Sequence, residues 1–464
     1  MSIEAAARAD GETRRAALIP PAPRQPPRDL PLLRLALMVR RNSLGAWPAR
    51  AYDEMLVHRR FFRVDYFLIN DPAAARRVFS EGADRYMRPI GVQRMLRPSV
   101  GTGLLTVDGE DWRRQRRMLA PAFTPQHIER LIPHFHDASR QMLSGMGSGG
   151  RFNLATLLET AVVDAVGRGL FSLPLHDRSS RIAGLLHTYF RGPAQATMWD
   201  FIARNEDDYA WRLRGRAAWS RIWFREIDAI VAARRAQPGS ARAHADVLDI
   251  LFAAKDTQTG APLTAEAIQG QVATLLSAGF ESTARTVFWA CYLLASDLAE
   301  QDAIRAELRA APPTGVNGLA ALRAWPRLSA TLLETMRLYP SVSVLARQAR
   351  APDEVLGKKV RTGDFVLVCP WVMHRHRKLW DAPEAFRPGR FLDPAARQNE
   401  AFAPFGVGRR VCIGASFATT EATILLAHLL HRFRVTLDDA RPVMPVATTT
   451  TAPDIEPWFR LTPA

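Results

Sequence analysis

The sequence predicts a mainly α-helical protein with a minor β portion (α+β), and three observations carry this prediction. Helical patterns dominate from Asp111 to about Leu298. One of them runs without proline from a Thr264 N-cap to Leu294, about 30 residues or 45 Å, long enough to cross the molecule. Residues typical of strands gather only in short segments, 61–69 and 355–369, without the strand–helix alternation of a doubly wound sheet.

The amino-terminal part predicts an arm, a short helix, a strand and a capped helix. Residues 1–30 are rich in Pro and Arg and predict a flexible arm, followed by a single domain over 31–464. The apolar run Leu30–Val39 is shorter than the ~20 residues of a membrane span. It predicts a helix packed on the body, or one lying weakly on a membrane surface. After the strand, Asp71 starts a helix that runs toward Phe79.

Composition and charge exclude several classes of protein. Of 464 residues, 47% are apolar and 23% charged, as in globular proteins. Lys and Arg number 62 against 46 acidic residues, a net charge of +16, but the arginines are scattered, which disfavours nucleic-acid binding. The three cysteines, Cys291, Cys369 and Cys412, lie far apart and suit a reducing cytoplasm better than a disulfide framework. Residues 1–19 lack the apolar core of a secretory signal.

The most informative segment is Pro404–Gly414, directly before a helical run from Ala415. Its glycines allow a tight loop, which places Cys412 where free backbone N–H groups can point at the sulfur. A lone free cysteine is usually a small buried hydrophobe. The pattern F-x-x-G-x-R-x-C-x-G outweighs that reading, because it resembles the cysteine loop of the cytochrome P450 family, the haem-thiolate monooxygenases. The resemblance implies haem b with Cys412 as the iron ligand, and Phe405 and Gly406 in the cofactor-binding loop.

Further segments resemble the family's porphyrin-binding motifs in the family's order. Trp112 and Arg116 match W-x-x-x-R, and their spacing puts them on one helical face. Without the family they would be a half-buried tryptophan and a solvated arginine. The resemblance adds Arg347, seven residues after Pro340, and Arg410, two before the cysteine. It implies that these four donors hold the two propionate carboxylates of the haem.

The long helix contains Ala278–Thr283, which resembles the family's A/G-G-x-D/E-T/S-T segment. The resemblance implies that this helix crosses the haem, that Gly279 leaves room for the cofactor, and that Thr283 and Glu281 are catalytic groups that organise protons. A structural alternative remains open. In it, the glycine permits close helix packing and the alcohols bond to carbonyls one turn back.

Glu334 and Arg337 lie three apart on a helix that Pro340 ends. Such pairs are common on exposed helix faces and are worth only ~0.2–0.5 kcal/mol. The resemblance implies a structural lock that also includes Arg390. Gly389 stands where the family usually has an acid, a minor departure from the pattern.

The resemblance implies insertion of one oxygen atom from O2 into a C–H bond of a hydrophobic molecule such as a fatty acid or a terpenoid. It places the substrate pocket in four segments, and the residues predicted to line it are Met95, Leu96, Thr274, Phe280, Val344, Leu345 and Thr449. Arg88, Arg94 and Arg97 are candidate anchors for a substrate carboxylate, although a solvated loop explains them more simply.

Electrons are expected from a separate ferredoxin or flavodoxin with its NAD(P)H reductase, because no flavin or iron–sulfur segment is visible. An acidic partner would dock where Arg113, Arg114, Arg117 and Arg409 gather. The sequence predicts a cytoplasmic monomer without a transmembrane span. Two alternatives keep the haem: an enzyme that uses peroxide or needs no redox partner (a peroxygenase or isomerase), and a non-catalytic haem sensor.

Overall fold

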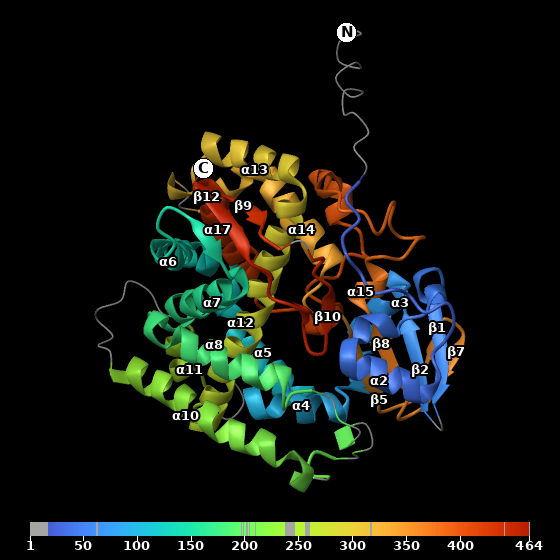
Figure 1. Ribbon diagram of the computed structural model, residues 1–464. Helices are drawn as coiled ribbons and strands as arrows, with labels where there is room; N and C mark the ends of the chain where they lie inside the picture. The colour runs from blue at the N-terminus through green and yellow to red at the C-terminus, as the bar shows by residue number, and fades with distance from the viewer. Residues whose placement is uncertain are drawn as a thin grey trace.

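The computed structural model confirms a mainly helical chain with small sheets (Figure 1). It describes residues 17–61, 64–195, 197, 199–200, 203, 205–208, 210–236, 246–255, 260–315, 318–439 and 441–463. The helices of at least eight residues are α2 (Leu32–Asn42), α4 (Ile90–Val100), α5 (Gly109–Leu119), α6 (Pro125–Ser144), α7 (Leu154–Phe171), α8 (His176–Arg191), α10 (Arg214–Ala236), α12 (Ala265–Ser296), α13 (Leu298–Ala310), α14 (Pro326–Leu338) and α17 (Ala415–Arg432). Shorter helices are α3 (Pro72–Arg76), α11 (Val247–Ala253), α15 (Pro370–Met373) and α16 (Pro394–Arg397).

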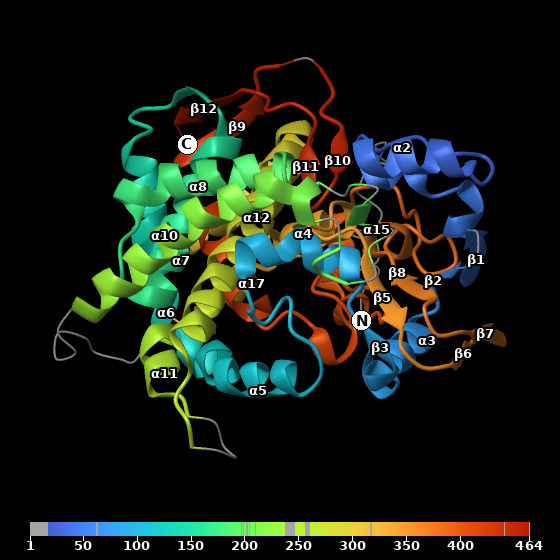
Figure 2. The same cartoon turned by 90° about the horizontal axis from the view of Figure 1, so that it is seen from below.

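Within the described part of the chain, the strands form four small sheets. The largest has the order β1-β2-β8-β5-β3, in which only β2 and β8 are parallel. Figure 2 shows this sheet on one side of the molecule and most of the helices on the other. The strands are β1 (Leu56–Phe61), β2 (Val64–Ile69), β3 (Tyr86–Met87), β4 (Gly150–Phe152), β5 (Leu345–Ala349), β6 (Asp353–Val355), β7 (Lys358–Val360), β8 (Phe365–Val368), β9 (Phe433–Leu437), β10 (Pro445–Ala447), β11 (Thr451–Pro453) and β12 (Phe459–Pro463).

The helix α12 runs through the centre of the helical part (Figure 1). Thr264 caps it by accepting a hydrogen bond from the Ala267 N–H at 3.1 Å, as its sequence predicts. At Gly279 a Cβ atom would lie 3.3 Å from Val166 Cγ2 of α7, so the glycine lets the two helices approach closely. This contact fits the packing alternative for Gly279, but the residue also keeps partly accessible surface, and its role in leaving room for the cofactor stays a prediction.

The predicted strand 61–69 is wrong at its start. The chain forms a hairpin instead, in which Phe61 of β1 pairs with Val64 of β2. Segment 61–69 contains no Gly or Pro that would mark the boundary between the two strands in the sequence. The helix after Asp71 forms as predicted, with the Asp71 carboxylate accepting the Ala74 N–H at 2.7 Å, and continues as a helical turn through Arg77–Glu81.

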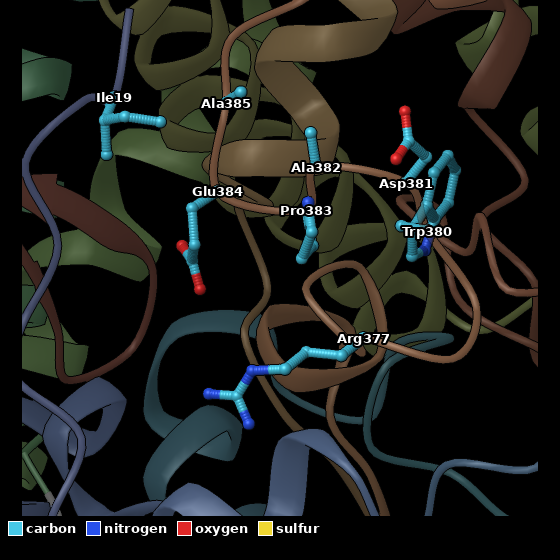
Figure 3. Close-up of a pocket in the computed structure, with 8 residues that line it drawn as sticks. All are labelled: Ile19, Arg377, Trp380, Asp381, Ala382, Pro383, Glu384 and Ala385. Atoms are coloured by element: carbon cyan, nitrogen blue, oxygen red, sulfur yellow. The ribbon is translucent and has the colours of Figure 1, made fainter.

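Part of the predicted arm is attached to the body. The Leu18 carbonyl accepts the Phe386 N–H at 2.8 Å, and the Pro21 carbonyl accepts the Tyr339 hydroxyl at 3.0 Å. Figure 3 shows a pocket beside this attached segment, which is lined by Ile19, Arg377 and residues 380–385. Residues 1–16 lie outside the described residues, and the domain boundary at residue 30 stays a prediction.

The amino-terminal helix α2 replaces the predicted Leu30–Val39 helix with a small shift, because Pro31 occupies its N-cap position. It has no buried residue, and Leu33 and Leu37 are 80% and 63% exposed. Among the described residues, we find no helix whose length and apolar content would suffice to cross a bilayer.

Candidate active site

The cysteine loop contains the 3₁₀ turn η11 (Gly408–Arg410), and Cys412 lies between this turn and the start of α17. The Cys412 N–H donates to the Phe405 carbonyl at 2.9 Å, which closes the loop. Gly406 and Gly408 have φ values of 89° and 76°, which favour glycine. A Cβ atom on Gly408 would lie 2.1 Å from the Phe79 carbonyl oxygen, so no other residue fits there.

The thiol of Cys412 is accessible, whereas Cys291 and Cys369 are buried. Low-polarity surroundings nevertheless raise the pKa of the Cys412 thiol, while the Gly414 N–H and the Arg116 charge oppose this rise. This environment fits a thiol that bonds to a buried cofactor.

The predicted propionate donors meet beside this loop. Arg116 donates from Nη1 to the Val411 carbonyl, next to the cysteine, at 2.8 Å. The Arg410 guanidinium stacks on the Trp112 ring at 4.7 Å. Arg410 also binds the Val107 carbonyl, at 3.0 Å, and the Asp108 carboxylate.

Arg88 joins this cluster, although the sequence suggested a substrate contact or a solvated loop. Its N–H donates to Asp108 Oδ2 at 3.3 Å, and its buried Nε has no partner among the described residues. Burial lowers the pKa of Arg88 to about 9 and that of Arg347 to about 10, and the nearby Arg410 charge acts in the same direction. Because Asp108 is the only carboxylate opposing these shifts in the described part, the positive charge of Arg88, Arg347 and Arg410 exceeds what it can neutralise. The cluster therefore fits the propionates of haem.

Glu334 and Arg337 form a buried ion pair rather than an exposed one. The Glu334 oxygens accept from Nε and Nη2 of Arg337 at 2.7 and 2.8 Å, and Nε of Arg390 lies 3.2 Å from Glu334 Oε1. Arg337 also donates to the His374 carbonyl at 2.8 Å. His374 in turn accepts the Ala403 N–H at Nε2, 2.9 Å away, directly before the cysteine loop. The buried ion pair is thus connected through His374 to the segment that leads into the cysteine loop.

At Gly389, the departure from the family pattern has little structural effect. Among the described residues nothing beyond its chain neighbours lies within 4 Å of the position that a Cβ atom would take. The ion pairs of Arg390 with Glu334 form without an acid at this position.

In the middle of α12, the structure distinguishes the two alcohols of the predicted motif. Ala278, Gly279 and Ser282 keep surface accessible between buried neighbours in the middle of this helix. The Ser282 hydroxyl donates to the Ala278 carbonyl at 2.9 Å, and Ser341 Oγ lies 3.0 Å from the Ser282 carbonyl. Ser282, which sequence reasoning passed over, is therefore the alcohol on the open side. The predicted Thr283 is only 2% exposed.

Thr283 points instead toward Glu421 of α17, a residue that sequence reasoning missed. Glu421 is 1% exposed, and neither of its carboxylate oxygens forms a well-aligned hydrogen bond within the described part of the chain. Burial raises the pKa of Glu421 well above its usual range, and the neighbouring Thr283 hydroxyl opposes the rise. The sequence feature that could have indicated Glu421 is an acidic residue within an apolar helix, nine residues after the cysteine.

These features match one family of proteins throughout the chain. The family model for cytochrome P450 matches residues 24–454. The chain belongs to the cytochrome P450 family. It is therefore an oxygen-incorporating oxidoreductase with a thiolate-ligated haem b cofactor.

Individual relatives of this P450 are distant. Cyclooctatin synthase of Streptomyces melanosporofaciens is 29% identical over 416 residues, which cover 88% of this chain and 89% of that protein. Human cytochrome P450 4A11 is 27% identical over 379 residues, 77% and 72% of the two chains. A retinoic-acid-bound cyanobacterial P450, CYP120A1, has the same fold, with a TM-score of 0.79 and 23% identity over 97% and 100% of the chains.

The predicted pocket residues of this P450 differ in accessibility. Phe280 is 1% exposed in the core, and Thr274 donates to the Gly270 carbonyl at 2.7 Å, so neither offers much free surface. Leu345 packs beside Gly406 of the cysteine loop. The others, Met95, Leu96, Val344 and Thr449, are half-buried, and the Thr449 hydroxyl is buried without a partner in the described part.

Two of the candidate carboxylate anchors already have partners. Arg94 lies 3.3 Å from Asp200 and is only 4% exposed, and Arg97 is paired with Glu206. Arg94 is therefore neither solvated nor a free anchor, whereas the side chain of Arg97 is 41% exposed and paired, and both arginines connect α4 to the segment that follows α8.

The four arginines of the predicted docking face are exposed but paired. Arg113 and Arg117 both bind Glu110, at 3.0 and 3.2 Å, and Arg409 binds Asp84 at 3.0 Å. Arg113 also binds Asp84, which joins α5 to the cysteine loop. Arg114 pairs with Asp111. Exposed pairs of this kind are worth only ~0–1 kcal/mol, so a partner's carboxylates can replace them.

Proposed function

We propose that this P450 is a monooxygenase that inserts one oxygen atom from O2 into a C–H bond of a hydrophobic small molecule such as a fatty acid or a terpenoid. The observation that carries this proposal is the accessible Cys412 thiol beside a cluster of arginines whose charge is mostly unneutralised. The acid and alcohols in the middle of α12 add groups that can hold and pass protons.

In this proposal the chain's residues divide into cofactor-binding and proton-handling groups. When bound, the thiolate-ligated haem supplies the activation of molecular oxygen. Cys412 would hold the iron, in the loop shaped by Phe405 and Gly406. The propionates would be held by the donors already described, Trp112, Arg88, Arg116, Arg347 and Arg410.

The protons would be held by Glu281 and passed toward the substrate side by the Ser282 hydroxyl. Thr283 lies on another face of α12, where its hydroxyl would contact the buried Glu421 carboxyl. An enzyme that only rearranges peroxides has no need of this proton supply, so the acid and alcohols favour O2 as the oxidant over the peroxide-dependent alternative.

The substrate class rests on the half-buried apolar side chains of Met95, Leu96, Val344 and Leu345. A structural neighbour binds retinoic acid, which is also a hydrophobic molecule. The test supplies the holoprotein with a ferredoxin, its reductase, NADPH and heavy-isotope O2, and screens fatty acids and terpenoids by mass spectrometry. Products carrying one labelled oxygen atom are expected. Product formed only from added peroxide, without label from O2, would contradict the proposal.

We infer that the redox partner is an acidic ferredoxin or flavodoxin that docks on the face of Arg113, Arg117 and Arg409. Charge reversal at Arg113 and Arg117 should slow reduction most at low ionic strength, where attraction is least screened. Arg460→Glu is the matched control, because Arg460 is an equally paired surface arginine in the β9–β12 sheet. If the variant with reversed charges at Arg113 and Arg117 is reduced as fast as the Arg460→Glu control at every ionic strength, this docking face is excluded.

We propose a cytoplasmic monomer whose α2 helix makes a weak contact with anionic membrane surfaces. Leu33 and Leu37 are exposed, and Arg40 and Arg41 occupy the last turn of α2. Flotation with vesicles containing phosphatidylserine should recover a fraction of the protein, and a Leu33→Ser, Leu37→Ser variant should lose it. Equal recovery of the variant, or binding to neutral vesicles alone, would refute the contact.

A further inference from the structure

A buried group of charged side chains lies where α12 meets α7 and α8. Arg285 of α12 places Nη2 2.7 Å from Oε1 of Glu159 in α7, but 3.8 Å from Oε1 of Glu281. The other oxygen of Glu159, Oε2, lies 3.6 Å from Nδ1 of His187 in α8. The side chains of Arg285, Glu159 and Glu281 are only 2%, 6% and 10% exposed. Glu159 therefore lies between the Arg285 guanidinium and the His187 imidazole, and Glu281 lies at the edge of this cluster.

The charges of this group do not balance when both glutamates are ionised. Arg285 keeps its charge at any working pH, and it is one cation for two buried carboxylates. The groups that act on Glu281 are Arg285 on its own helix, Glu159, His187 and the Thr450 hydroxyl. Further out, Glu456 interacts with Arg285 and His187 and is paired with Arg191 at 2.9 Å.

The geometry assigns the arginine to Glu159. The short contact is the ion pair with Glu159, 2.7 Å against 3.8 Å for Glu281. Among the described residues Glu159 Oε1, Glu281 Oε2 and Arg285 Nε are all buried without a well-aligned hydrogen bond, so the distances decide the assignment. A buried carboxylate without a close cation retains its proton, because the neutral form avoids the desolvation of a charge. In agreement, burial raises the pKa of Glu281.

We propose that Glu159 holds Arg285 away from Glu281, so that Glu281 keeps its proton and is ready to donate it. This inference rests on the proposed function. On donation, the O–H bond of Glu281 breaks and its proton passes to an acceptor oxygen on the substrate side. The carboxylate then recovers a proton from solvent. Arg285 and Glu159 are positioning residues, since they act through Glu281.

The direct test measures the protonation of Glu281 in the haem-loaded protein. Infrared spectra at neutral pH should show a carboxylic-acid C=O band that Glu281→Gln removes. In Glu159→Gln, Arg285 is free to pair with Glu281, so the midpoint for loss of the band should fall by at least about one pH unit, a tenfold change in proton affinity. In Arg285→Met the band should persist to higher pH than in the wild type.

A matched control separates this effect from a general loss of packing. Asp164 is an equally buried carboxylate of α7, paired with Arg168 at 2.6 Å. Asp164→Asn should destabilise the fold but leave the infrared midpoint unchanged.

A second measurement is the fraction of the supplied electrons that ends in hydrogen peroxide instead of product. Glu159→Gln should raise the fraction of electrons released as hydrogen peroxide several-fold, with unchanged substrate affinity. If the wild type has no such band, or if Glu159→Gln leaves both its midpoint and the peroxide fraction unchanged, the inference is wrong. The reduced carbon-monoxide spectrum and the labelled product would be unaffected by that failure, so the proposed function is tested separately.

Discussion

At the scale of single residues, the arginines around Arg88 show how the binding site of an anionic group can be recognised from the protein alone. Each guanidinium in the cluster loses hydration on burial, and within the described chain only the Asp108 carboxylate compensates. Such an arrangement is unfavourable alone and becomes favourable when carboxylates bind. The sequence named Arg88 only as a candidate substrate anchor. It could not assign Arg88 to the haem site, because its placement depends on a contact with Asp108, twenty residues later.

Arg88→Gln should therefore weaken haem retention. Loss of one charge-assisted hydrogen bond is worth ~1.5–3 kcal/mol, or roughly a ten- to hundredfold faster transfer of haem to apomyoglobin. Arg97→Gln, which removes an arginine nearby in sequence that pairs with Glu206, should transfer haem at the wild-type rate. Equal rates for wild type and Arg88→Gln would remove Arg88 from the haem site.

The alcohol motif was located by sequence, but its orientation was not. Ser282 and Thr283 are adjacent and point in directions about 100° apart on a helix, so spacing alone does not say which one faces open space. Packing decides this, because Thr283 meets Glu421 while Ser282 keeps accessible surface.

Ser282→Ala should raise the peroxide formed per electron by about tenfold, because it removes a proton-transfer group on the open side. Thr283→Val should have a smaller effect. Peroxide and product are measured together during steady turnover. The opposite order of the two variants would favour the original prediction that Thr283 is the catalytic alcohol.

At the scale of elements, long helices with local signals were predictable and short strands were not. The limits of α12 follow from the Thr264 cap and a long stretch without proline. The boundary between β1 and β2 was missed because no Gly or Pro marks it in the sequence. Likewise, the Glu334–Arg337 pair was recognisable by its spacing, but its burial depends on contacts with Arg390 and the segment after His374.

Two buried histidines predict a dependence of stability on pH: His374, which accepts the Ala403 N–H before the cysteine loop, and His428 of α17, which pairs with His136 of α6. Burial lowers the pKa of His374 to about 3, and burial together with His136 lowers the pKa of His428 to about 4. An unfolded histidine titrates near ~6.5, so the unfolded state binds more protons below that value. The stability from each neutral histidine is thus complete above pH ~6.5 and decreases as the pH falls.

Urea unfolding at a series of pH values checks this expectation. Each histidine should contribute up to about 1.4 kcal/mol per pH unit to the decline between pH ~6 and ~4, and His428→Gln should reduce the slope by that amount. His176→Gln, at the exposed start of α8, is the control. An unchanged slope in His428→Gln would show that this histidine is not held neutral.

At the scale of the whole molecule, the family and the fold class followed from sequence, whereas sheet order and pocket shape did not. The largest sheet joins β2 to β8 across some three hundred residues, and no local pattern records that pairing. The predicted pocket likewise combined accessible side chains with Phe280, which the core encloses. The positive charge is also less available than the composition suggests, because the docking-face arginines are all paired with acids.

The most direct test of the whole account is the spectrum of the reduced, haem-loaded protein under carbon monoxide. A sulfur anion on the iron should give the strongly red-shifted band of a thiolate-ligated haem. Cys412→Ala should lose this band, whereas Cys291→Ala, which alters a buried cysteine of α12, should keep it. A wild-type band at the position typical of nitrogen-ligated haem, or a red-shifted band that survives in Cys412→Ala, would contradict the assignment of Cys412.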